Sequence, residues 1–177
     1  MTGSSIGRPD AAEYVPYYHK YVSLVPDGEI TGLLSRQMDE TLALLAKVSE
    51  EQAGFRYAPD KWSIKELVGH LIDSERIFAY RALRFARNDK TSLPGYEQDD
   101  YVREASFDER SLRDLAAEFS DVRRATLSLF ENLGEAAWGR SGAANDSAVS
   151  VRALAYIIAG HELHHVGILR DRYLPSL

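Results

Sequence analysis

Residues 151–173 read VRALAYIIAGHELHHVGILRDRY, a run whose apolar residues recur at steps of three and four. That spacing places them on one face of an α-helix. Ser150 stands directly before the run, where its hydroxyl can cap the first turn, and Pro175 follows where a helix should already have stopped. The pattern predicts a helix from Val151 to about Tyr173 that packs against other helices through its apolar side.

Three earlier segments have the same helical periodicity, and no segment shows convincing strand alternation. These segments are residues 29–52, 63–88 and 111–133. Ser63 and Glu66 form a capping-box pattern at the start of the second segment. We therefore predict an all-α fold, a four-helix bundle with long connecting loops, in a single domain over residues 1–177. Residues 1–10 are expected to be loosely ordered, and residues 14–25 to pack as a short extra turn over the bundle.

The connections between the predicted helices are rich in Gly, Pro, Asp and Ser, and two are longer than bundle loops usually are. They are residues 53–62, 89–109 and 134–150. Long connections in compact domains often carry function, so 89–109 is a candidate active-site rim. Within it, Tyr96 and Tyr101 are expected either to line a substrate pocket or only to tie the loop to the bundle.

Composition excludes several classes of function. The chain has 177 residues, 45% of them hydrophobic, with a net charge of −6 and a sequence pI near 5.4, so we expect no nucleic-acid partner. It has no cysteine, so a metal site must use His, Asp or Glu. No apolar run approaches the roughly 20 residues that span a bilayer, and the N-terminus lacks a signal-peptide pattern. The expected location is the cytoplasm, with no membrane association.

Three of the five histidines lie in one short stretch, GHELHH, at residues 160–165. His161 and His165 are one helical turn apart inside the apolar stripe, a spacing that lets two imidazoles converge on one metal ion. His164 falls at the margin of the stripe, beside the site or in a pocket wall. Glu162 lies near the stripe and is a candidate catalytic base, or a partner for a histidine N–H. The alternative is that the histidines form hydrogen bonds with no ion present.

The stretch also matches H-E-x-x-H, the zinc-peptidase signature. One peptidase subclass continues with a helix-breaking glycine and a third histidine, but here those positions hold Ile168 and Asp171. Another takes a glutamate from a later helix, whereas the chain ends at Leu177, soon after His165. The peptidase interpretation is therefore rejected.

His70 is the remaining candidate for a third ligand. It flanks the apolar face of the 63–88 helix, where it is either a metal donor or an edge histidine near the surface. Three neutral imidazoles would leave a coordination position open, as in catalytic zinc sites. Asp73, three residues on, could orient His70 or form an exposed salt bridge.

A row of arginines follows on the same predicted helix. It consists of Arg76, Arg81, Arg84 and Arg87. Such a row is usually a solvated, salt-bridged face, and the alternative is a clamp for an anionic substrate or thiol cofactor.

Residues 61–87 and 149–174 together resemble the DinB superfamily of four-helix bundles, which includes YfiT-like metal-dependent hydrolases. The shared features are the Lys-Trp-Ser helix start, Gly-His-Leu with an acidic residue, the late His-x-x-His-His, Pro-Gly at 94–95 and Trp138. The resemblance implies a divalent metal, nickel or zinc, bound by His70, His161 and His165. It also implies a possible low-molecular-weight thiol cofactor and a homodimer.

These observations predict a metal-dependent enzyme in which metal-activated water or thiol is the nucleophile. The reaction would be hydrolysis or thiol S-transfer on a small-molecule substrate whose identity the sequence leaves open. The alternative is a non-catalytic, metal-stabilised bundle that binds a small ligand or a partner.

Overall fold

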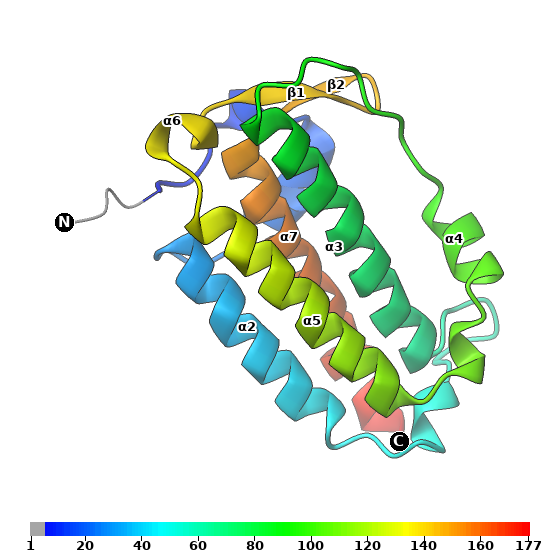
Figure 1. Cartoon of the computed structure of the whole chain (residues 1–177). Helices are drawn as coiled ribbons and strands as arrows, with labels where there is room; N and C mark the ends of the chain where they lie inside the picture. The colour runs from blue at the N-terminus through cyan, green and yellow to red at the C-terminus, as the bar shows by residue number, and fades with distance from the viewer. Residues whose placement is uncertain (1–5) are drawn as a thin grey trace.

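The computed structural model describes residues 6–177, and its four longest helices form a bundle (Figure 1). These helices are α2 (Ile30–Leu45), α3 (Ile64–Ala86), α5 (Leu112–Glu131) and α7 (Val151–Ile168). The predicted fold class, a mainly helical four-helix bundle, is confirmed. Among the described residues no helix is both long enough and apolar enough to cross a membrane.

The bundle has an uncommon order of neighbours. Helix α2 packs against α5 and α7, and α3 packs against the same two helices, so the consecutive helices α2 and α3 lie diagonally opposite. Helices α3 and α5 run in one direction and α2 and α7 in the other (Figure 1). The connection from α3 to α5 must therefore return along the whole bundle. The long loop, with α4 (Gln98–Glu104) inside it, makes this return.

The predicted helix starts are confirmed. Ser63 Oγ accepts a hydrogen bond from the Glu66 amide at 3.1 Å, and the Glu66 carboxylate accepts one from the Ser63 amide at 2.8 Å. Ser150 Oγ accepts from the Ala153 amide at 2.9 Å. Because each cap satisfies amides that have no partner within the helix, α3 and α7 begin one residue after their caps.

Two helix ends differ from the sequence prediction. The first long helix ends at Leu45 rather than near residue 52, because Ser49 and Gln52 exchange side-chain and backbone hydrogen bonds that start a new turn. The last helix changes after Ile168 into a π-helical turn, Leu169–Tyr173. Leu169 and Tyr173 are both buried there, so the altered turn keeps two large side chains in the core.

The expectation of no strands is wrong for residues 134–150. Here β1 (Ser141–Ala144) and β2 (Ser147–Ser150) form an antiparallel hairpin after the short helix α6 (Glu135–Trp138). Asn145 and Asp146 connect the strands with φ of +52° and +57°, values typical of a two-residue hairpin turn. The strands consist mostly of Ser, Ala and Gly, residues without β preference, so alternation gave no signal.

The N-terminal segment is held against the bundle. Helix α1 (His19–Val22) packs on α7, as expected for an extra turn. Arg8 donates hydrogen bonds to the carbonyls of Val22 at 2.8 Å and Val25 at 2.5 Å. Of the stretch 1–10 that was expected to be loosely ordered, residues 1–5 lie outside the described residues.

The core consists of two apolar clusters with a polar layer between them. On α3, Ile64–Ile72 contribute to one cluster and Phe78–Ala86 to the other. The same division occurs on α5 and α7. The buried polar residues between the clusters are Gln37, Thr41, His70, Ser74, Glu75, Ser120, Arg123, His161 and Glu162.

Arg123 of α5 is the centre of this layer and is fully buried. Its Nε donates to Glu75 Oε1 at 2.8 Å, and its Nη2 lies 2.8 Å from carboxylate oxygens of both Glu75 and Glu162. Its Nη1 donates to the Leu34 carbonyl at 2.9 Å. Burial opposes the charge, but the two carboxylates outweigh it and raise the pKa of the guanidinium above its usual value. One side chain therefore joins all four long helices.

We expect Arg123→Met to destabilise the fold by about 3–5 kcal/mol, because it leaves buried carboxylates without a counter-charge. The matched control is Arg124→Met at the adjacent position, where Arg124 is exposed and its pair with Asp121 at 3.4 Å contributes at most about 1 kcal/mol. Urea unfolding followed by circular dichroism measures both variants. Equal unfolding midpoints for the two would contradict the central role of Arg123.

Candidate metal centre

Three histidines from two adjacent antiparallel helices meet in the polar layer. His70 comes from α3, and His161 and His165 come from successive turns of α7. One ring nitrogen of each lies within 4.8 Å of the others, and His70 Nε2 is 3.0 Å from His161 Nε2. The structure thus brings together the three residues that the sequence proposed as ligands.

The three imidazoles are neutral at physiological pH. Burial lowers the pKa of His70 to about 4, and burial together with the neighbouring histidines lowers that of His165 to about 2. The same causes put the pKa of His161 well below its usual value. His70 is 2% exposed, so the interpretation of it as an edge histidine is wrong. Neutral imidazole is the form that binds a metal.

The spacing of the histidines fits a metal ion. Zinc–nitrogen bonds of about 2.0–2.1 Å in a tetrahedral site place ligand nitrogens roughly 3.3 Å apart, close to the 3.0 Å between His70 and His161. The same separation also fits a hydrogen bond between the two rings. Elemental analysis of the purified protein distinguishes histidines that bind an ion from histidines joined only by hydrogen bonds.

Ser74 is the polar group that contacts His70, and the sequence analysis missed it. Its hydroxyl lies 3.4 Å from His70 Nδ1 and 2.8 Å from the Tyr96 hydroxyl. Of the two alternatives for Asp73, the structure shows the salt bridge, with Arg76 at 3.8 Å. The signal for Ser74 was its spacing of four residues from His70, which places both on one face of α3.

Glu162 does not join the histidine cluster, whereas His164 flanks it, with its ring centre 5.1 Å from that of His165. Glu162 accepts a hydrogen bond from Thr41 at 2.6 Å and pairs with Arg123, and within residues 6–177 it makes no hydrogen bond to a histidine. His164 is half-buried beside Tyr21, with ring centres 5.4 Å apart. The geometry favours a structural role for Glu162 over the role of catalytic base.

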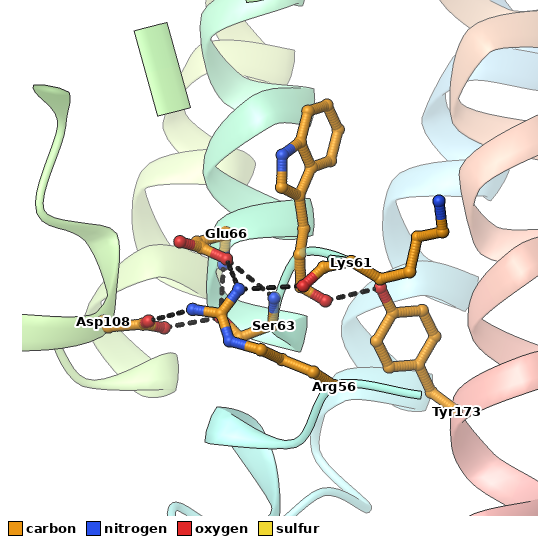
Figure 2. Close-up of polar contacts among 7 residues, drawn as sticks. Arg56, Lys61, Ser63, Glu66, Asp108 and Tyr173 are labelled. Carbon is orange, nitrogen blue, oxygen red and sulfur yellow. Dashed lines mark hydrogen bonds and ion pairs between the residues drawn. The ribbon is translucent and has the colours of Figure 1, made fainter. Parts of the chain in front are cut away.

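Trp62 covers the cluster from the start of α3. Its ring centre lies 4.7 Å from that of His70 and 6.3 Å from that of His165. The chain on either side of Trp62 is fixed by polar contacts shown in Figure 2. Arg56 pairs with Glu66 and with Asp108, and the Tyr173 hydroxyl donates to the Trp62 carbonyl at 2.7 Å. These contacts hold Trp62 over the histidines.

Two cavities reach the cluster from different sides. The first, about 370 Å³, extends to His161, and the second, about 420 Å³, extends to His165. The walls of the first include Tyr18, Tyr21, Phe78, Arg81, Tyr96 and Asp99. The walls of the second include Tyr57, Lys61, Trp62, Asp99 and Tyr173. The long loop thus lines both cavities, and Tyr96 is a wall residue, whereas Tyr101 is 47% exposed.

The arginine row of α3 separates into exposed and buried members. Arg76 pairs with Glu118 at 2.7 Å, Arg84 pairs with Asp89, and Arg87 is exposed, as a solvated face requires. Arg81 is buried and faces the first cavity.

The sequence matches the family model of the DinB superfamily over residues 33–169, which includes the four bundle helices nearly whole and all three clustered histidines. The chain belongs to the DinB superfamily. No curated protein matches the sequence.

Solved structures share the DinB fold with this chain. YfiT from Bacillus subtilis, described as a probable metal-dependent hydrolase with an unusual four-helix bundle topology, aligns with a TM-score of 0.70 and 14% identity over 86% of this chain and 90% of its own. The DinB-like protein YjoA from B. subtilis aligns with a TM-score of 0.62 and 23% identity over 84% of this chain and 92% of its own. A mycothiol-dependent maleylpyruvate isomerase aligns with a TM-score of 0.65 and 12% identity over 82% of this chain and 61% of its own. At these identities the likeness establishes the fold alone.

Gly160 permits the close approach of α1 to α7 beside the histidines. A Cβ at Gly160 would lie 2.0 Å from the Tyr21 carbonyl oxygen, which is backbone and cannot move away easily. The Tyr21 ring packs edge-on against His161, with ring centres 5.2 Å apart. Glycine at this position therefore brings Tyr21 onto the cluster.

We expect Gly160→Ala to destabilise the protein by about 1–3 kcal/mol, because the added methyl group displaces α1. Gly167→Ala is the matched control on the same helix, where a Cβ would meet nothing within 4 Å. That control should stabilise by about 0.5–1 kcal/mol, since alanine is the better helix former. Thermal unfolding of both variants compares them, and a neutral effect of Gly160→Ala would show that α1 packs more loosely.

Proposed function

We propose that this chain is a metal-dependent enzyme whose divalent ion, nickel or zinc, is held by His70, His161 and His165. The observation that supports the proposal is the meeting of three neutral imidazoles, within 4.8 Å, at a point that two cavities reach. An ion held by these three residues would lower the pKa of a bound water or thiol, so that either could act as a nucleophile near neutral pH.

The chain's own groups orient the ligands and limit access of water. The Ser74 hydroxyl lies 3.4 Å from Nδ1 and 3.5 Å from Nε2 of His70, so it contacts the edge of the ring and helps to orient it while Nε2 faces His161. The Tyr96 hydroxyl in turn contacts Ser74 and links this chain of contacts to the first cavity. The Trp62 ring packs against His70, with ring centres 4.7 Å apart, and helps to keep that imidazole out of solvent.

Two cavities at one centre favour a reaction between two molecules over simple hydrolysis, because water needs no cavity of its own. Volumes of about 370 and 420 Å³ suit small ligands. Transfer to or from a low-molecular-weight thiol uses both cavities, whereas hydrolysis uses one. The descriptions of YfiT as a probable metal-dependent hydrolase and of the third solved structure as a mycothiol-dependent maleylpyruvate isomerase are consistent with these two reaction classes.

Protein purified without chelators should contain about one nickel or zinc ion per chain by elemental analysis. His161→Ala should lose most of it, because two imidazoles hold an ion far more weakly than three. His19→Ala is the control, since His19 contacts Tyr14 at 3.3 Å and lies outside the cluster. Circular dichroism checks that each variant is folded.

If His161→Ala has the same metal content as His19→Ala, the proposed ligand set is wrong. If the metal is present but no thiol, electrophile or ester is turned over, while ligands still bind in a metal-dependent way, the chain is instead a binding module.

Ser74→Ala should weaken metal binding by about 10-fold or more, since a group that orients a ligand histidine contributes on that scale. Asp73→Asn, the adjacent change, should leave the metal affinity unaltered because Asp73 pairs with Arg76. Competition with a chromophoric chelator measures both affinities. A larger effect at Asp73 than at Ser74 would reverse this assignment.

A further inference from the structure

Arg81 is a buried cation without a carboxylate partner among residues 6–177. Its side chain is nearly enclosed, with the residue 4% exposed, and its Nη2 donates to the Pro94 carbonyl at 2.9 Å. Arg123, the other buried arginine among the described residues, has two carboxylates at 2.8 Å. Buried charges are normally paired, so Arg81 lacks the counter-charge that its burial calls for.

Arg81 is a wall residue of the first cavity, which also reaches His161. Its guanidinium stands 5.9 Å from the centre of the Phe78 ring. The nearby phenols do not neutralise it, because burial raises the pKa of Tyr18 and of Tyr96 and keeps both hydroxyls protonated. A ligand in this cavity would therefore meet one positive charge and several aromatic walls.

The mouth of the cavity limits the charge of that ligand. Glu97 and Asp99 line the cavity but are exposed, and within residues 6–177 neither forms an ion pair with Arg81. On the other side Lys20 lies over the rings of Tyr17 and Tyr21, at 4.1 and 4.8 Å. These two protein carboxylates repel a doubly charged phosphate ligand more strongly than a ligand that has one carboxylate. A carboxylate is also planar and therefore matches the geometry of the Arg81 guanidinium.

We propose that the first cavity binds a small molecule with one carboxylate, held by Arg81, and with an unsaturated or aromatic body against Phe78, Tyr18 and Tyr96. The other end of the molecule then points toward His161. The assignment of this molecule as the substrate rests on the proposed function, whereas the carboxylate site itself does not need the metal.

Calorimetric titration of the metal-loaded protein with benzoate tests the proposal, with benzamide as the neutral probe of the same shape. Benzoate should bind more tightly than benzamide. Arg81→Gln should weaken benzoate binding by roughly tenfold or more, because a charge-assisted contact is lost. Arg81→Lys should recover part of the affinity, and Arg84→Gln, a change at an outer position of the same helix, should have no effect.

Two further measurements distinguish this carboxylate site from the proposed metal site. His165→Ala removes a metal ligand outside the walls of this cavity, and it should keep the affinity for benzoate. Loss of benzoate binding in His165→Ala would mean that the carboxylate binds the metal and would overturn the role of Arg81. Elemental analysis of Arg81→Gln should still give the wild-type metal content, so a failure of the metal proposal is recognised independently.

Equal benzoate affinity in wild type and in a folded Arg81→Gln would refute the site. Tighter binding of inorganic phosphate than of benzoate would overturn its assignment to a carboxylate.

Discussion

A guanidinium at the centre of a helical bundle stays charged only where carboxylates and carbonyls replace its hydration, and Arg123 obtains both from the other three helices. Glu75 on α3, Glu162 on α7 and the Leu34 carbonyl on α2 all lie within 2.9 Å of it. Such a network adds little net stability compared with an apolar core, but removal of one member is costly. Its main effect is to allow one arrangement of the helices and to penalise others.

The histidine cluster depends on that arrangement. His161 precedes Glu162, and adjacent residues of a helix point about 100° apart. The ion pair between Glu162 and Arg123 therefore turns His161 toward α3. On α3, His70 and Glu75 are five residues apart, and both are buried in the same polar layer. The ion pair therefore fixes the rotation of both helices, and the imidazoles meet as a consequence. Apolar clusters above and below exclude water and keep the imidazoles neutral.

Much of this could be predicted from the sequence, because the information was local. Helical periodicity, the Ser63 and Ser150 caps and the one-turn spacing of His161 and His165 are all contained in short segments. It was harder to predict the roles of Glu162, Ser74 and Arg81, because their environments depend on other parts of the chain. Periodicity places Arg81 in a row of arginines, but only the fold shows that the Pro94 loop covers that one member. The β-hairpin was not predicted for a different reason, because its small residues have no strand preference.

The two cavities follow from the topology. Because α3 and α5 run in the same direction, their connection must cross the bundle from end to end, and it passes alongside α3 (Figure 1). That loop supplies Tyr96 to one cavity and Asp99 to both. The three clustered histidines lie on helices, whereas part of the wall of each cavity lies on a connection that tolerates change. A bundle of this kind can therefore alter what it binds by changing one loop while the polar layer remains intact.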